Sequence, residues 1–272
     1  MRADSVTFVY GGGFALRELS LAVGASSLLG VIGPNGSGKS TLLRLLAGLL
    51  LPDAGRVLLD GVDLRRSGRS AVARRLALVP QETHPSFDYT VLELVLMGRY
   101  PHLGAFEIEG PGDIAIARDA LEATGTLAFE GRLFSTLSGG EKQRVILASA
   151  LAQLGVADGA SPKGGHLLLL LDEPTASLDL RYQLEIARII RRLHADREVG
   201  IVLSTHDLGL AASVCEELVL LREGRLLASG PVDVVLTREN VRRLYDVDAD
   251  VTFSSRAGHL TIVPVDHEPC AR

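Results

Sequence analysis

The hydrophobic pattern of the chain alternates between short apolar runs and longer segments of mixed polarity. Continuous apolar runs within residues 27–32, 166–174 and 200–206 are typical of strands that are covered on both faces. The segments 40–50 and 181–197 have the spacing of helices that bury one face. Strands that alternate with helices in this way predict an α/β fold around a mostly parallel sheet.

Three other stretches depart from this alternation. Residues 5–10 (SVTFVY) alternate apolar with polar side chains, as a half-exposed strand does, and residues 217–230 predict a hairpin that turns at Glu223 and Gly224. Residues 87–159 are mainly helical, and they include a long amphipathic helix that begins near Glu141. We therefore predict a helical lobe inserted into the α/β core.

Composition and charge narrow the function classes. The 272 residues carry 28 Lys and Arg against 33 Asp and Glu, a net charge of −5, which argues against a dedicated nucleic-acid binder. The arginine-rich residues 65–75 are expected to be the solvated side of a helix. Cys215 and Cys270 are expected to be ordinary reduced thiols. No signal peptide or bilayer-spanning run is evident, so we expect a soluble chain whose membrane role would need a partner.

Residues 33–41 (GPNGSGKST) fit the phosphate-binding pattern G-x-x-x-x-G-K-[ST] between a predicted strand and helix. Lys39 can reach the β- and γ-phosphates of a nucleotide, and Ser40 can supply its hydroxyl to Mg²⁺. The alternative is a glycine-rich turn with an incidental lysine, which the flanking elements disfavour. The pattern predicts a phosphate loop made of Gly33, Pro34, Asn35, Gly36, Ser37, Gly38, Lys39, Ser40 and Thr41.

Two carboxylates, Asp172 and Glu173, follow the apolar run of residues 167–171. Ligands of open α/β sheets bind at the carboxyl ends of the strands, and adjacent carboxylates repel each other unless a cation is present. We predict that Asp172 holds Mg²⁺ and that Glu173 polarises an attacking water. An exposed strand end, or an N-cap of the next helix, is the alternative.

The stretch 135–144 (STLSGGEKQR) predicts a second phosphate-binding helix start. Ser138 and Glu141 form a capping box, but this does not explain Gly139 and Gly140. A serine hydroxyl, unhindered N–H groups and a helix dipole together bind phosphate. We predict that these residues close on the ATP of a second copy of the chain, and that the glycines admit its γ-phosphate.

The stretch 135–144, the phosphate loop and LLLLLDEP, in this order, resemble the ATP-binding cassette (ABC) ATPases. The resemblance covers residues 5 to about 265. It implies a P-loop ABC ATPase core with a mostly parallel sheet, an N-terminal antiparallel β subdomain and an inserted helical subdomain. The single nucleotide-binding domain then spans residues 1–272, with its parts at 1–86 and 160–230 (core), 87–159 (helical lobe) and 231–272 (C-terminal segment).

The resemblance also implies roles for single residues and for two cofactors, ATP and Mg²⁺. Tyr10 would stack on adenine, although it could be a plain strand-face tyrosine. Gln81 would contact Mg²⁺ and water, Asp179 would lie in the loop along a dimer interface, and His206 would contact the γ-phosphate. In the implied mechanism a homodimer sandwiches two ATP molecules and opens after hydrolysis.

Residues 90–104 (TVLELVLMGRYPHLG) resemble the ATPases of importers for iron–siderophore, haem and vitamin B12, as does the tail at 258–265. The resemblance implies a peripheral motor on the cytoplasmic face of the membrane. Its partners would be an integral-membrane permease in two copies, met by residues 81–101, and indirectly a periplasmic or extracellular binding protein. No nucleic-acid partner is expected.

Other interpretations stay open at this point. The chain could serve another transporter class, such as an exporter or a small-ion importer. It could also be a non-transport ABC ATPase that acts on nucleic acid or ribosomes, although its acidic charge and single cassette argue against this. The stretch 155–166 is longer than the family pattern and is expected to be a surface loop.

Overall fold

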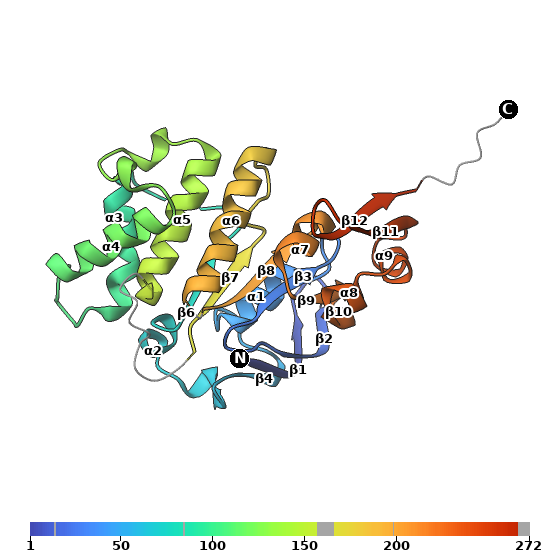
Figure 1. Cartoon of the computed structure of the whole chain (residues 1–272). Coiled ribbons are helices and arrows are strands. Elements are labelled where there is room, and N and C mark those ends of the chain that lie inside the picture. The colour runs from blue at the N-terminus through green and yellow to red at the C-terminus, as the bar shows by residue number, and fades with distance from the viewer. Residues whose placement is uncertain (14, 84, 157–165, 198, 266–272) are drawn as a thin grey trace.

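The computed structural model describes residues 1–13, 15–83, 85–156, 166–197 and 199–265 (Figure 1). Its centre is a six-stranded sheet in the order β10-β9-β3-β8-β7-β6. Every neighbouring pair is parallel except the β9–β10 hairpin, so the predicted mostly parallel sheet is confirmed. The strands are β3 (Leu28–Ile32), β6 (Leu76–Val79), β7 (Leu168–Asp172), β8 (Gly200–Thr205), β9 (Glu217–Arg222) and β10 (Arg225–Pro231).

A second, antiparallel sheet lies beside the first, in the order β2-β1-β4-β5. It consists of β1 (Arg2–Val9), β2 (Ala15–Ala22), β4 (Ala54–Leu59) and the short β5 (Val62–Asp63). The helix α1 (Lys39–Leu46) shares a hydrophobic core with this sheet and with one face of the central sheet. The antiparallel β subdomain expected at the N-terminus is therefore present.

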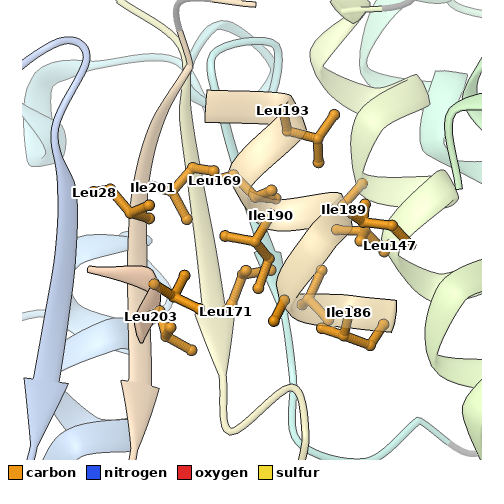
Figure 2. Packing of buried hydrophobic residues seen from close by; sticks show 14 of the residues in the cluster. Leu28, Leu147, Leu169, Leu171, Ile186, Ile189, Ile190, Leu193, Ile201 and Leu203 are labelled. Atoms are coloured by element: carbon orange, nitrogen blue, oxygen red, sulfur yellow. The ribbon is translucent and has the colours of Figure 1, made fainter. Parts of the chain in front are cut away.

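The central strands are apolar throughout because both of their faces are covered. In β7, Leu168 and Leu170 pack toward α1 and the antiparallel sheet, while Leu169 and Leu171 pack into the opposite core. That opposite core includes Ile190, one of the isoleucines of α6 (Leu180–Arg197) that face the sheet in Figure 2. Alternate side chains thus enter two cores, and no position of β7 remains for a polar residue before Asp172.

Helical elements follow β6 and form a lobe at the left of Figure 1. A capping box starts α3 at Thr90, where Glu93 accepts a hydrogen bond from the Thr90 N–H at 2.8 Å. The bounds of residues 87–159 as a structural unit stay a prediction. The elements are α3 (Val91–Leu96), η2 (Met97–His102), α4 (Pro111–Ala123), η3 (Leu127–Phe129), η4 (Phe134–Thr136) and α5 (Gly139–Leu154).

The prediction that the helix near Glu141 is amphipathic was wrong. No residue of α5 from Gly140 to Leu154 is exposed. The reason is that α3, α4 and η2 cover one side of this helix, while β6 and α6 cover another. A helix enclosed by several elements needs no solvated stripe, so its polar side chains meet protein partners. One of these is Gln153, whose amide donates to the carbonyls of Ala73 and Leu76 at 2.8 and 3.0 Å.

The arginine-rich residues 65–75 form two short helices rather than one, η1 (Leu64–Arg66) and α2 (Arg69–Ala73). Arg65, Arg66, Arg69 and Arg74 are exposed, as expected for a solvated face. Cys215 is buried, and burial raises the pKa of its thiol to about 12. It is therefore an unreactive core residue. Cys270 and most of the loop at 155–166 lie outside the described residues.

The C-terminal segment lies at the right of Figure 1. The predicted strand at 258–265 is present, but it pairs only with β11 in a separate two-stranded sheet. Within the described ranges, no helix is long and apolar enough to cross a membrane. The elements from β8 onward, besides β9 and β10, are α7 (Leu208–Val214), α8 (Val232–Val235), α9 (Arg238–Tyr245), β11 (Ala249–Ser254) and β12 (His259–Pro264).

Gly98 should be essential to the packing of the helical lobe. A Cβ at this position would overlap the backbone carbonyl of Ser149 on α5. We expect Gly98→Ala to lower the free energy of unfolding by about 1–3 kcal/mol, the usual cost of overpacking, measured by urea denaturation. Gly112→Ala on α4 is the control, because its Cβ would meet no atom within 4 Å. Equal unfolding midpoints for the two variants would contradict the packing argument.

Candidate active site

Three strand ends meet at one edge of the central sheet. The register pairs Ile32 of β3 with Thr205 of β8, and Ser204 of β8 with Asp172 of β7. The residues that follow these ends therefore lie next to one another, although they come from distant parts of the sequence. This is the edge at which open α/β sheets bind ligands.

The phosphate loop connects β3 to α1. Gly36 and Gly38 have φ angles of +77° and +107°, which side chains rarely tolerate. A Cβ on Gly33 would overlap the carbonyl oxygen of Leu221 on the neighbouring strand. No side chain caps the N-terminus of α1, whose N-cap is Gly38. These features leave the start of α1 available to an anion.

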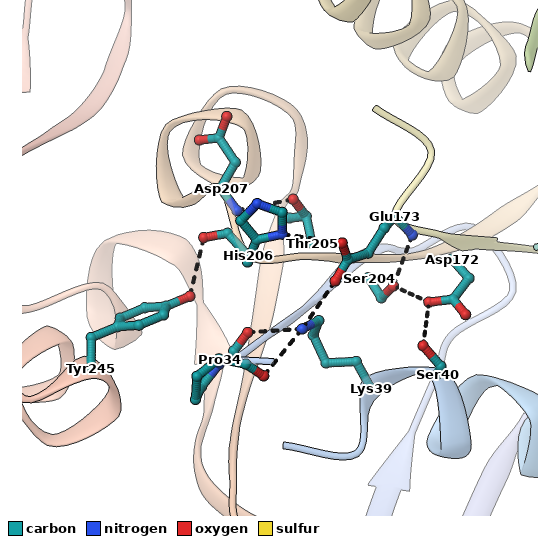
Figure 3. Close-up of polar contacts among 11 residues, drawn as sticks. Pro34, Lys39, Ser40, Asp172, Glu173, Ser204, Thr205, His206, Asp207 and Tyr245 are labelled. Atoms are coloured by element: carbon teal, nitrogen blue, oxygen red, sulfur yellow. Dashed lines mark hydrogen bonds and ion pairs between the residues drawn. The ribbon is translucent and has the colours of Figure 1, made fainter. Parts of the chain in front are cut away.

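Lys39 lies at the centre of the loop and is buried. Its Nζ donates to the carbonyls of Gly33 at 2.9 Å and Pro34 at 3.3 Å, and it pairs with Glu173 Oε1 at 3.1 Å (Figure 3). Both charges of this pair are removed from water, which would be costly without the pairing. The ammonium group is thus held at the place where the phosphates would bind.

Asp172 is fixed by two hydroxyl groups. Its Oδ1 accepts a hydrogen bond from Ser204 at 2.7 Å and another from Ser40 at 3.0 Å. Ser40 belongs to α1 and Ser204 to β8, so the carboxylate links three elements. The structure therefore brings together Ser40 and Asp172, the two residues predicted to hold Mg²⁺, and their role as ligands stays a prediction.

Glu173 has an unusual backbone conformation, with φ at +46°. Such angles are uncommon for residues with a side chain and persist only where neighbours enforce them. Here Ser204 accepts twice from the Glu173 N–H, through its carbonyl at 3.1 Å and its hydroxyl at 3.0 Å. The turn that results directs the carboxylate toward Lys39 and toward His206, whose Nδ1 lies 3.1 Å from Glu173 Oε2 (Figure 3).

A pocket of about 730 Å³ opens over these groups. Tyr10 and Gln81 lie on its wall, so the structure brings them to the site as expected. Tyr10 also makes an edge contact with Phe8, with ring centroids 4.9 Å apart. The described residues that line the pocket are Tyr10, Asn35, Gly36, Gly38, Lys39, Ser40, Thr41, Gln81, Glu173, Ala176, Ser177 and His206.

The second predicted phosphate end is not part of this pocket. Ser138, Gly139 and Gly140 are not among its lining residues, and neither is Asp179, which caps α6 by accepting from the Tyr182 N–H at 3.1 Å. The predicted capping box between Ser138 and Glu141 is present.

The two glycines of this helix start differ in their surroundings. Ser138 and Gly139 are exposed, whereas Gly140 is buried under Tyr182, and a Cβ there would overlap the tyrosine ring. Packing within one chain already accounts for Gly140. No packing contact of this kind explains Gly139. Gly139 and Ser138 therefore remain the residues predicted to contact a second copy of the chain.

Sequence reasoning missed two residues at the site. Ser204 is completely buried and holds both Asp172 and Glu173. The sequence could have indicated Ser204, because it is a polar residue in a buried strand two positions before His206. Tyr245 donates its hydroxyl to the carbonyl of His206 at 3.1 Å, and nothing in the nearby sequence indicates this contact.

A loop of positive-φ glycines, a buried lysine at a helix start and two carboxylates at the end of β7 define a P-loop nucleotide-binding site. The chain belongs to the ABC transporter family, whose model matches residues 16–176. The cassette fold and the implied antiparallel and helical parts are confirmed with it.

Curated relatives cover nearly the whole chain. The cobalamin import ATP-binding protein BtuD of Halobacterium salinarum is 41% identical over 92% of this chain. The chain spans only 60% of that relative's length. The hemin import ATP-binding protein HmuV of Bordetella pertussis is 40% identical, and the match covers 92% of this chain and 94% of the relative.

A solved structure is similar over its whole length. It is described as a metal-chelate type ABC transporter in an inward-facing conformation, and it is 27% identical with a TM-score of 0.82. The match covers 98% of this chain and 97% of that chain.

Lys39→Ala should weaken ATP binding by about 10- to 100-fold, because hydrogen bonds to charged groups contribute about 1.5–3 kcal/mol. Isothermal titration with ATP measures the dissociation constant directly. Arg44→Ala is the control, since Arg44 is an exposed residue of the same helix and does not line the pocket. An unchanged dissociation constant for Lys39→Ala would contradict a role of this lysine in ATP binding.

Proposed function

We propose that this chain is the ATP-hydrolysing motor subunit of an importer for a metal chelate, and that it drives a separate integral-membrane permease. The observation that carries the proposal is the set of contacts Lys39–Glu173–His206 beside the phosphate loop. A phosphate-binding cation, a carboxylate and a histidine stand there within one pocket. This arrangement suits cleavage of a terminal phosphate by water.

The residues that line the pocket suggest how a nucleotide would lie in it. Adenine would stack on Tyr10, and the phosphates would lie along the loop at the start of α1. Lys39 would then exchange its contact with Glu173 for the β- and γ-phosphate oxygens. That exchange releases the carboxylate at the moment the substrate is in place, so that Glu173 can accept a hydrogen bond from the attacking water.

His206 lies just beyond the end of β8, two residues after Ser204. Its imidazole can contact the γ-phosphate while Nδ1 remains near Glu173. Catalysis of this kind depends on holding water and phosphate in line and on stabilising charge, with no covalent bond to the protein.

The donor set near Ser40 fits Mg²⁺. Ser40 Oγ lies 3.0 Å from Asp172 Oδ1, and Ser40 and Gln81 both line the pocket. The described residues include no cluster of three or more His, Cys, Asp or Glu that could hold a metal alone. A few oxygen ligands suit Mg²⁺, which keeps waters and substrate phosphates in its shell. Bound there, the ion would neutralise phosphate charge.

A second copy would complete the site. The exposed Ser138 hydroxyl and the open Gly139 lie at the start of α5 and away from this chain's own pocket. We propose that Ser138, Gly139 and Gly140 bind the γ-phosphate of the partner's ATP, with Asp179 along the interface. ATP would then close the homodimer and hydrolysis would open it.

Exposed apolar side chains support a permease contact after β6. Phe87 is 73% exposed, Tyr100 57%, Phe106 fully exposed and Ile108 82%. Tyr100 and Ile108 line one surface pocket, and neighbouring exposed apolar side chains are typical of a docking site. We propose that the permease, in two copies, contacts this region from the membrane, which places the chain at the cytoplasmic face, with a binding protein beyond the membrane.

The names of the relatives support the class of cargo. Hemin and cobalamin are both large metal chelates, and the similar solved structure is described as metal-chelate type. We therefore propose a chelate of iron or cobalt as the transported molecule.

Glu173→Gln should bind ATP, hydrolyse it about 100-fold more slowly or worse, and accumulate as a closed dimer. The amide keeps the shape of the side chain but cannot accept the proton from water. Size-exclusion chromatography with ATP measures the dimer.

The matched control is Ser138→Arg in the Glu173→Gln background. It should still bind ATP through the phosphate loop, yet stay monomeric. A monomeric Glu173→Gln protein in saturating ATP would contradict the dimer, and a dimeric double variant would contradict the role of Ser138.

The permease should copurify with this chain. Tagged Glu173→Gln, with ATP, is used as bait on detergent-solubilised native membranes, and a polytopic protein is expected. The permease identified in this way is then reconstituted in vesicles with the wild-type chain, ATP and haem, a ferric siderophore or cobalamin, because the Glu173→Gln motor would not turn over. Uptake of one chelate supports the proposal, whereas capture of an exporter, of soluble proteins alone or of nucleic acid would overturn it.

A further inference from the structure

The C-terminal helix α9 is anchored beside the phosphate loop. Val241 and Leu244 are buried in the larger core, and the helix ends at Asp246, whose φ of +58° turns the chain away. The anchor positions Tyr245, the last residue of α9, against the active site.

Arg222 holds this end of α9 in place. Its guanidinium donates to Asp246 Oδ1 at 3.1 Å and Oδ2 at 2.7 Å, and also to the carbonyl of Arg243. Two-pronged contacts of this kind fix orientation as well as distance. Arg222 is the last residue of β9, so the central sheet itself sets the position of the helix end.

A small cavity of about 280 Å³ separates α9 from the phosphate loop. Pro34, Asn35, Gly36 and Ser37 lie on one side of it, and Leu244, Tyr245 and Asp246 lie on the other. The C-terminal segment is therefore a neighbour of the phosphate loop, although more than two hundred residues separate them in the sequence.

Tyr245 reaches past this cavity to His206. Its hydroxyl donates to the His206 carbonyl at 3.1 Å, and Figure 3 shows the phenol on the side of His206 away from Glu173. Burial raises the pKa of Tyr245, and the negative charges of Asp207 and Glu173 raise it further. The phenol thus keeps its proton and remains a hydrogen-bond donor.

The carbonyl of His206 lies between two regular elements. β8 ends at Thr205, and the first backbone acceptor of α7 is Asp207, which accepts from the Ala211 N–H at 3.1 Å. Neither element supplies the contact that Tyr245 makes. The imidazole is 55% exposed, so packing does little to orient it.

We propose that Tyr245 is a positioning residue for ATP hydrolysis, and that its hydroxyl fixes the peptide of His206 so that the imidazole faces Glu173 and the γ-phosphate. The inference rests on the proposed function of the site. Tyr245 is not among the residues that line the nucleotide pocket, and it acts through His206. The C-terminal segment thereby contributes to turnover as well as to stability.

Tyr245→Phe tests the hydroxyl alone, because the ring and its packing remain. Loss of one hydrogen bond at a positioning contact should lower kcat about three- to tenfold, with KM for ATP and the thermal midpoint unchanged. Thr252→Val is the control. It removes an exposed hydroxyl from β11 in the same C-terminal segment, where Thr252 Oγ1 lies 3.3 Å from Thr261 Oγ1, and it should leave kcat unchanged.

A second readout follows the imidazole directly. In protein with isotope-labelled histidine, the His206 ring signal, assigned with His206→Gln, should shift in Tyr245→Phe and stay in place in Thr252→Val. An unchanged kcat, an unmoved His206 signal, or a fall in kcat that is accompanied by a lower thermal midpoint would each overturn the proposal. Failure of the wild-type chain to hydrolyse ATP would instead overturn the proposed function.

Discussion

Parallel pairing of β3, β8 and β7 is the constraint on which the site depends. Because the three strands run in the same direction and are in register, the residues after Ile32, Thr205 and Asp172 emerge together at one edge of the sheet. This pairing brings Lys39 and Glu173 together, although they lie far apart in the sequence. The apolar side chains of β7 fill cores on both faces, and their burial keeps the strand in register.

The buried pair of Lys39 and Glu173 depends on this arrangement. The desolvation cost of burying the two charges is offset because they form an ion pair. The carbonyls of Gly33 and Pro34 also accept hydrogen bonds from the Lys39 ammonium group. The positive φ of Glu173 opposes folding by about 1–3 kcal/mol, and the two hydrogen bonds from its N–H to Ser204 offset that strain. In the proposed function, a binding phosphate replaces Glu173 as the partner of Lys39, so the pair that stabilises the empty site would be exchanged when nucleotide binds.

Much of the fold and part of the site could be predicted from the sequence, because the signals involved are local. The phosphate loop, the acidic strand end and the capping box each lie within about ten residues, and the structure has them as expected. Contacts between residues that are far apart in the sequence have no local pattern of this kind and could not be predicted. The enclosure of α5 depends on helices that precede it, and the overlap of Gly140 with Tyr182 joins two separate motifs. A glycine in a motif therefore has two possible explanations, and only the fold separates them.

The same reasoning explains why Tyr245 was missed. A residue that lies beyond a strand end no longer makes the backbone hydrogen bonds between strands that would fix its conformation. Its backbone therefore needs a hydrogen bond from another element. Glu173 receives this support from the adjacent β8, whereas His206 follows β8 itself and receives it from α9. The sheet can bring reactive groups together, but it cannot orient what lies beyond its edge. Residues that supply orientation are consequently found in any part of the chain, and here in its C-terminal segment.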